Sequence, residues 1–195
     1  MPDLLFANEI RQKRADAVEN YALLLETAKR LFDEQGVEHV SMSAIAEAAG
    51  VGKGTLYRHF PNKVALTQAL LDADQRDLQA RTFAYLAQPG DPVQHLRWFM
   101  GEAFAFVSRN LTHMYSENPQ VAWSLLDHPA HLWWRLTIRG LLARIHPGTD
   151  VDYAADVLYV MLDARTIAFQ RNALGYDVDR MVSGLLATVD RFVSR

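Results

Sequence analysis

Apolar residues recur at intervals of three and four along almost the whole chain, which places them on one face of an α-helix. In the first half, Val18, Tyr21, Leu25 and Phe32 follow this spacing, and Gly36 is a natural residue to end their helix. The pattern predicts helices over 14–35, between Ser41 and Gly50, over 53–60 and over 62–87. The residues before them, 1–12, are predicted to form a loose arm.

The second half has the same periodicity in longer and more apolar segments. We expect it to form helices over 93–109, 120–126, 130–145, 150–173 and 177–193. The run Gln88–Pro92 contains two prolines and a glycine and breaks the pattern firmly. The prediction is therefore an all-α protein with a head over 1–61, a connecting helix over 62–88 and a second domain over 92–195.

Composition narrows the function classes further. Half of the 195 residues are apolar, so a sizeable core can form, and the net charge is −3. The absence of cysteine excludes disulfides, thiolate catalysis and cysteine-ligated metal, and it suits a reducing compartment. We find no signal peptide and no apolar run long enough to span a membrane, so a cytoplasmic protein is expected.

Segment 41–63 carries the clearest chemistry. Ser41 is a good N-cap, and Gly50 gives the backbone the freedom that a sharp turn after a helix needs. Gly52 can cap the following helix, which ends before Pro61. Two short helices joined by such a turn are typical of a helix-turn-helix, whose second helix enters the DNA major groove. An ordinary helical corner would also fit a Gly-Val-Gly turn considered alone.

The side chains of that second helix suit DNA. They include hydrogen-bond donors but no acid, while Leu56 and Phe60 lie four apart and can anchor the helix on its neighbours. Gly54 has no side chain, so the backbone can approach a duplex closely. All four lysines, Lys13, Lys29, Lys53 and Lys63, lie in the first third of the chain. A mildly acidic protein can bind DNA when its basic groups are gathered in this way.

The segment GVGKGTLYRHFPNK, preceded by SMSAIAEAAG, closely resembles the DNA-binding signature of the TetR (tetracycline-repressor-like) transcriptional regulators. The resemblance runs from the first helix to the start of the fourth, and beyond it only length and helical pattern agree. One departure is Gly52, where the family most often has Ser or Thr. The resemblance implies base or nearby phosphate contacts for Lys53, Thr55 and Arg58, and sugar-phosphate contacts for Tyr57, His59 and Lys63. We also expect Arg14, Ser41 and Ser43 at the DNA interface.

Aromatic residues are abundant in the second domain, and aromatic-lined spaces between helices are where small ligands bind. The candidate ligand residues are Trp98, Phe99, Glu102, Phe106, Trp123, Trp134, Asp163 and Thr166. The plainer interpretation is a large core. Polar residues of the 150–173 helix equally form a solvated stripe, and Arg135, Arg139 or Arg165 could pair with any carboxylate that is buried.

A metal site or an active site has little support. His113, His128 and His131 are close in sequence, but Pro129 prevents the last two from sharing a helix face. Phosphate-binding loops, nucleophile elbows and zinc-protease motifs are absent from the sequence. We therefore expect no catalytic residue, metal or cofactor.

The resemblance implies a homodimer formed through the last two helices, 150–173 and 177–193. It further implies a repressor that leaves a palindromic operator when a small, largely apolar or aromatic effector binds. Ligand-dependent activation stays open. The alternative is a helical small-molecule-binding protein or enzyme whose head no longer regulates transcription.

Overall fold

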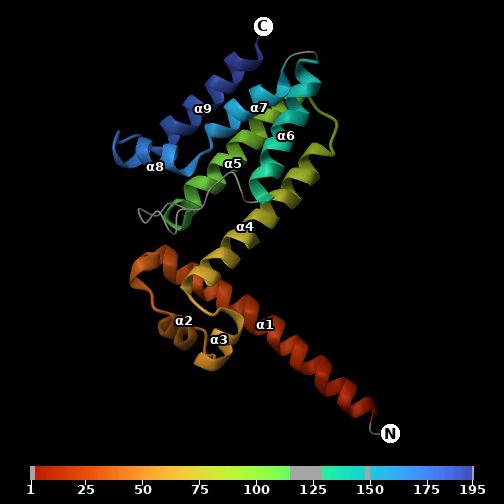
Figure 1. Ribbon diagram of the computed structural model, residues 1–195, viewed down its shortest axis with the longest axis vertical. Coiled ribbons are helices and arrows are strands. Elements are labelled where there is room, and N and C mark those ends of the chain that lie inside the picture. The colour runs from red at the N-terminus through yellow and green to blue at the C-terminus, as the bar shows by residue number, and fades with distance from the viewer. Residues whose placement is uncertain (1–2, 115–128, 148–149, 195) are drawn as a thin grey trace. The chain divides into compact units, whose positions relative to one another are not determined.

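The computed structural model describes residues 3–114, 129–147 and 150–194, and within these ranges every regular element is a helix (Figure 1). The all-α prediction is confirmed. The chain forms two compact units, Met1–Ala73 and Asp74–Arg195. No helix in the described ranges combines the length and the apolar character needed to cross a membrane.

The first unit contains three α-helices, a short 3-10 helix and the start of a fourth α-helix. These are α1 (Asp3–Gln35), η1 (Val37–His39), α2 (Met42–Ala48), α3 (Lys53–His59) and α4 (Lys63–Leu86). The core of this unit is contributed by each of the α-helices in turn: Leu24, Ala28, Phe32, Ile45, Ala46, Leu56, Leu66 and Leu70. The two short helices α2 and α3 pack beside the C-terminal half of α1 (Figure 1).

The expected loose arm over 1–12 is wrong for the described residues, because α1 begins at Asp3. From Asp3 onward the sequence contains no proline or glycine before Gly36, and it is rich in leucine, alanine, glutamate and arginine. These residue types have high helix propensity, so nothing local stops the helix from extending. At its other end the prediction is confirmed, since Gly36 has φ of 83°.

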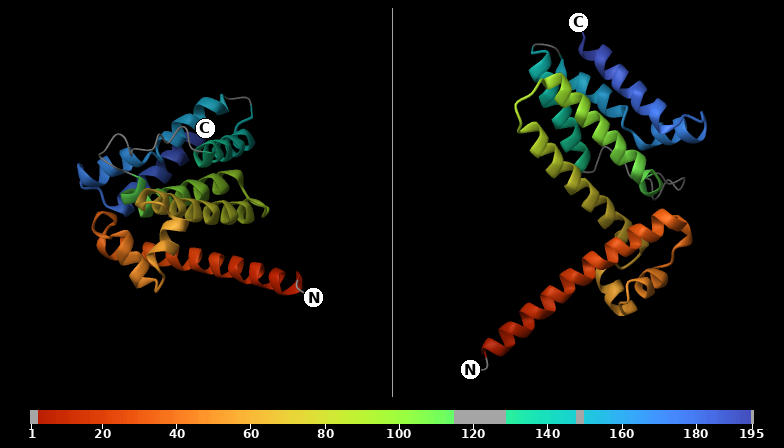
Figure 2. Two further views of the ribbon diagram at one scale, coloured as in Figure 1. Left: turned by 60° about the horizontal axis from the view of Figure 1, so that its bottom comes forward. Right: turned by 180° about the vertical axis from the view of Figure 1, so that it is seen from behind.

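The second unit contains the rest of α4 and five further helices, α5 (Pro92–Met114), α6 (Pro129–Ile145), α7 (Val151–Val160), α8 (Ala164–Asn172) and α9 (Val178–Val193). Helix α5 is the central one, in contact with α6, α8 and α9 (Figure 2). Its near-continuous apolar sequence explains this position, because a helix that is apolar on all sides must be surrounded. Phe99, Met100, Ala103 and Val107 are completely buried there.

The boundary between the units falls inside α4, between Ala73 and Asp74, rather than at the Gln88–Pro92 loop. Leu66 and Leu70 belong to the core of the first unit, whereas Gln75, Leu78 and Thr82 are buried in the second. A helix break is visible in sequence, but the place where buried contacts change from one core to another is not.

The single long helix expected over 150–173 is wrong, because α7 and α8 are separated at Met161–Asp163. The Asp163 carboxylate accepts a hydrogen bond from the Thr166 backbone N–H at 2.9 Å and caps α8. Aspartate competes well for this role because it satisfies an amide that the helix leaves unpaired. The helix expected over 120–126 lies outside the described residues.

Candidate nucleic-acid interface

The turn between α2 and α3 is fixed by backbone hydrogen bonds. Ser41 Oγ accepts from the Ala44 N–H at 3.1 Å and caps α2. At the other end, Gly50 N–H donates to Glu47 O and Val51 N–H donates to Ala46 O, both at 3.0 Å. This pair of bonds is the Schellman motif, and the φ of 67° at Gly50 is the left-handed conformation that the motif requires. The predicted cap and turn are both confirmed.

Helix α3 has one buried side and one exposed side. Leu56 and Phe60 are buried in the core of the first unit, as their spacing predicted. Lys53, Tyr57 and Arg58 are exposed, and Thr55 is half-buried. Arg58 Nη2 donates to Thr55 Oγ1 at 3.4 Å. The packing of the apolar pair thus turns two cations and a phenol outward.

The N-terminal turn of α3 is open on its outer side. A Cβ placed on Gly52 or Gly54 would meet no other atom within 4 Å. Gly52 precedes α3 with extended backbone angles and provides no side-chain cap. Neither glycine is required by the head's own packing, so the bare backbone at Gly54 is available for close approach by a large partner.

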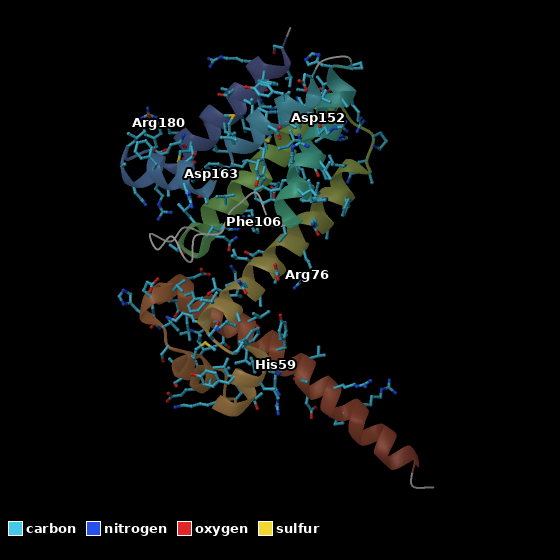
Figure 3. The ribbon with its side chains drawn as sticks, viewed as in Figure 1. His59, Arg76, Phe106, Asp152, Asp163 and Arg180 are labelled. Carbon is cyan, nitrogen blue, oxygen red and sulfur yellow. The ribbon has the colours of Figure 1, made fainter. Side chains whose placement is uncertain are left out.

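Two of the residues assigned to the DNA backbone already make contacts within the head. Lys63 Nζ donates to the Val37 carbonyl oxygen at 2.8 Å, and this bond ties the start of α4 to η1. His59, labelled in Figure 3, is half-buried, with its ring 5.9 Å from the Tyr21 ring. Its Nε2 is enclosed and has no hydrogen-bond partner among the described residues. A phosphate would therefore meet another part of the imidazole, and it would share the three hydrogens of the Lys63 ammonium with Val37.

The remaining candidates are distributed around α1 and α2. Arg14 is exposed on α1, and Ser43 is half-buried in the first turn of α2. The Ser41 oxygen accepts the capping bond, which leaves its hydroxyl hydrogen to donate elsewhere. The segment around α3 is also positively charged, because residues 48–71 contain Lys53, Arg58 and Lys63 but no aspartate or glutamate.

In the second unit, the structure brings several predicted ligand residues together. Phe99, Phe106 and Trp134 are buried among α5 and α6, and the rings of Phe106 and Trp134 meet edge to face at 5.4 Å. Trp98 is half-buried and stacks on Tyr85 at 4.2 Å. Trp123 lies outside the described residues. Phe106 and Trp134 thus pack against each other, whereas Trp98 packs against Tyr85, and neither pairing could be predicted from the sequence.

The predicted polar ligand residues mostly have other partners. Glu102 forms an ion pair with Arg81 of α4, and this pair also raises the pKa of Arg81. Asp163 caps α8, and the Thr166 side chain is exposed. None of the three proposed arginines serves Glu102. Arg81 could not be predicted as the partner of Glu102, because no feature of the sequence links it to a residue on the next helix.

The polar stripe proposed for 150–173 is split between α7 and α8, and part of it forms ion pairs with α6. Asp152 accepts from Arg139 Nε at 2.8 Å, and Asp156 accepts from Arg135. Arg135 lowers the pKa of the Asp156 carboxyl through this hydrogen bond. The carboxylates are exposed, so the solvated-face interpretation fits them. Figure 3 labels Asp152 and Asp163 on their separate helices.

The histidine region falls largely outside what can be described. His128 lies outside the described residues, as do the side chains of His113 and His131. Among the residues that the structure describes, no group of three or more histidine, aspartate or glutamate residues is arranged to hold a metal ion.

Comparison with known proteins gives three findings. Residues 24–70 match the family model described as bacterial regulatory proteins, tetR family. A helix-turn-helix-type transcriptional regulator of Staphylococcus aureus is 51% identical over 65 residues, which is 33% of this chain and 34% of that protein. The matched segment therefore spans about a third of this relative.

The fold is similar over a much larger share of the chain. A TetR/AcrR-family transcriptional regulator from Thermobifida fusca has a TM-score of 0.68 at 20% identity and covers 88% of this chain and 96% of its own. NalD, the secondary repressor of the MexAB-OprM multidrug efflux pump in Pseudomonas aeruginosa, has a TM-score of 0.60 at 26% identity, with coverage of 90% and 97%. The likeness in sequence is thus concentrated in the head, while the likeness in fold extends through both units.

Proposed function

We infer the function of this chain from the family that it belongs to, the TetR family of bacterial regulatory proteins. We propose that it is a cytoplasmic, sequence-specific DNA-binding regulator of transcription, and that it acts as a repressor. Because the family consists of regulatory proteins rather than enzymes, the alternative of a catalytic second unit is set aside.

One observation carries this proposal. The packing of Leu56 and Phe60 exposes Lys53, Tyr57 and Arg58 on α3, next to the open backbone at Gly54. Arginine and lysine can donate to the acceptors of guanine, and a phenol can donate to phosphate. In our proposal the N-terminal part of α3 enters the major groove, Lys53, Thr55 and Arg58 contact bases, and Tyr57 positions the helix on the backbone.

Exposed apolar side chains support a homodimer through the last part of the chain. Tyr153, Val157 and Val160 of α7 are 70%, 39% and 60% exposed, and Phe169 of α8 is 58% exposed. Tyr153, Val157 and Val160 are spaced by four and three, so they share one face of α7, and an exposed apolar face is typical of an association site. A two-fold dimer would present two α3 helices to the two halves of a palindromic operator.

Regulation would be a coupling free energy between the DNA site and an effector site in the second unit. Helix α4 supplies buried residues to both units, so a change in its position is the natural link. We propose that an apolar or aromatic effector favours a state whose heads no longer match the operator. The effector must bind that state more tightly than the operator-binding state, since equal affinity would shift nothing.

Selection of bound genomic fragments by purified protein, at a stated salt concentration, tests the proposal. An enriched palindrome is expected, and its affinity should fall steeply as salt rises because phosphate contacts release counterions. If folded, dimeric, ligand-free protein enriched no sequence, the proposal of a repressor that binds its operator without a ligand would be overturned. Enrichment only after a ligand is added would support the ligand-dependent alternative.

Variants of α3 test the assignment of contacts. Tyr57→Ala should weaken binding to all sequences, whereas Lys53→Ala and Arg58→Ala should change which bases are preferred at specific positions. Arg144→Ala on α6 removes an exposed cation outside the head and serves as the matched control. Wild-type affinity and specificity in all three α3 variants would contradict the proposed interface.

A further inference from the structure

Gln75 on α4 is a buried amide with half of its hydrogen-bonding capacity unused. The residue is 7% exposed, and its Oε1 accepts from the Trp134 indole Nε1 at 3.1 Å. Its Nε2 is enclosed, and none of the described residues accepts a hydrogen bond from it. A buried donor without a partner is unfavourable, so its presence in a packed core calls for an explanation.

The orientation of this amide is fixed by chemistry. An indole N–H can only donate, so the oxygen of Gln75 must face Trp134 and the NH₂ group must face the other way. The alternative orientation would place two donors together and lose the existing bond. The unused hydrogens therefore belong to a neutral, strong donor that the protein holds in one direction.

Nearby polar groups have partners of their own. Asn110 Nδ2 donates to Asp74 Oδ2 at 3.1 Å and to the Phe106 carbonyl oxygen at 3.0 Å. Further along α4, Arg81 is paired with the Glu102 carboxylate of α5. The charges around the cluster are thus engaged within the protein, while the Gln75 amide nitrogen is not.

We propose that Gln75 Nε2 donates a hydrogen bond to an acceptor oxygen of the effector, and that the effector is a neutral, largely apolar molecule carrying a carbonyl or similar group. This inference rests on the proposed function, because it assumes that the second unit binds an effector. It deepens that function by naming the chemistry that is recognised. Trp134 is bonded to the same amide and its ring meets Phe106 edge to face, so these two rings are the apolar neighbours expected to contact the effector.

The same arrangement argues against charged ligands. A cationic ligand would need a carboxylate, and both nearby carboxylates have partners, since Glu102 pairs with Arg81 and Asp74 accepts from Asn110. An anionic ligand would need a cation, and a neutral amide cannot compensate the loss of a carboxylate's hydration. A single acceptor oxygen matches the one unused donor group without leaving a second buried charge.

The test compares two pairs of probes that differ only in a carbonyl, acetylnaphthalene with ethylnaphthalene and cyclododecanone with cyclododecane. Dissociation constants are measured by quenching of tryptophan fluorescence for the full chain and for Gln75→Met. For each protein we take the ratio of the dissociation constants of the ketone and its matched hydrocarbon. Comparing this ratio between the two proteins cancels the cost of dehydrating the ketone, which is the same for both. We expect this ratio to move against the ketone by about fivefold to tenfold in Gln75→Met, as the loss of one neutral hydrogen bond implies.

Gln94→Met is the matched control, since Gln94 is an exposed glutamine on α5. Its ratio should equal that of the wild type. A ratio unchanged in Gln75→Met would overturn the inference while leaving effector binding intact. Failure of all four probes to bind would overturn it together with the effector part of the proposed function, whereas operator selection would be unaffected.

A second measurement does not depend on a variant that folds. The side-chain NH₂ signals of Gln75 are followed by nuclear magnetic resonance in the ¹⁵N-labelled wild type while ketone is added. A downfield shift at saturating ketone, absent with the matched hydrocarbon, is expected for a donor that gains an acceptor. Signals that do not move with ketone would overturn the inference.

Discussion

The two units place their polar chemistry in opposite ways. In the first unit the candidate functional groups lie within a few residues of one another on α3 and face outward. In the second unit the distinctive polar groups face inward and find partners far along the chain, with Asn110 bonding Asp74 across 36 residues and Trp134 bonding Gln75 across 59. A surface motif can therefore be recognised from local sequence, while an internal site depends on the assembled helices.

The largest effect should come from the core that holds α3 in place. Leu56 is completely buried, and Leu56→Ala is expected to lower the free energy of unfolding of the head by about 2–5 kcal/mol. Leu23, which is 40% exposed on α1, provides the matched control, and Leu23→Ala should cost below about 0.5 kcal/mol. Urea denaturation measures both. If the two substitutions lowered the free energy of unfolding by similar amounts, the burial of Leu56 would not be what holds α3 in place.

A substitution at Gly54 can distinguish what folding requires at this position from what DNA binding requires. Gly54→Ala adds a methyl group that meets nothing in the protein, so it should leave the fold intact or stabilise it by up to about 1 kcal/mol. If the backbone of α3 contacts the duplex, the same change should weaken operator binding by about tenfold, or 1.4 kcal/mol.

Gly140→Ala on α6 is the control for this change, because that glycine is also exposed and open. It should leave operator affinity unchanged. Melting temperatures and operator titrations of both variants give the comparison. If Gly54→Ala bound the operator as tightly as the wild type, the α3 backbone would not contact DNA.

A cap in the second unit tests whether Asp163 serves the fold or a ligand. Asp163→Ala should destabilise the unit by about 1 kcal/mol, as Ser41→Ala should in the head, because both side chains cap helices. Asparagine is an equally good cap, so Asp163→Asn should have near wild-type stability. Denaturation midpoints decide this point. A loss of effector affinity in Asp163→Asn at unchanged stability would restore the ligand role.

The smallest effect concerns the exposed ion pairs between α6 and α7. Arg135 lowers the pKa of Asp156, so the folded state binds this proton less readily than the unfolded state does. The resulting stability is fully present above the pKa of the carboxyl in the unfolded state, which is about 4. It is lost as the pH falls through the lower pKa of the folded state. Wild-type protein should therefore lose more stability on acidification than Asp156→Asn.

The size of that difference should remain below about 1 kcal/mol, because the Asp156 carboxylate is half exposed and the pair is open to solvent on that side. Urea midpoints measured from about pH 6 down to about pH 2 would show it. Added salt should reduce the difference by screening. Equal acid sensitivity of the two proteins would mean that the pair contributes nothing in solution.

The sequence predicted the elements that depend on local chemistry. The cap at Ser41, the turn at Gly50 and the buried pair on α3 all follow from residues within one or two helical turns. The early start of α1 was missed because a charged terminus resembles an arm when only its composition is considered. The break at Asp163 was missed because one capping residue outweighed a continuous apolar pattern.

The contacts of the second unit were largely unpredictable for a different reason. Whether a carboxylate such as Glu102 faces a ligand or an arginine depends on the register of two helices, and neither apolar periodicity nor composition specifies that register. Gln75 was overlooked because a single glutamine on an exposed-looking helix is ordinary in sequence. Only the position of Trp134 opposite it makes the amide distinctive.

The polar bonds of α4 also determine how this helix can move within the second unit. Apolar side chains tolerate small slides past one another, but the bonds from Asp74 to Asn110, from Gln75 to Trp134 and from Arg81 to Glu102 are directional. Sliding by one residue, a rise of about 1.5 Å, would move the donor or the acceptor of all three bonds out of line at the same time. The three directional bonds together therefore oppose a displacement of α4 along its own axis within the second unit.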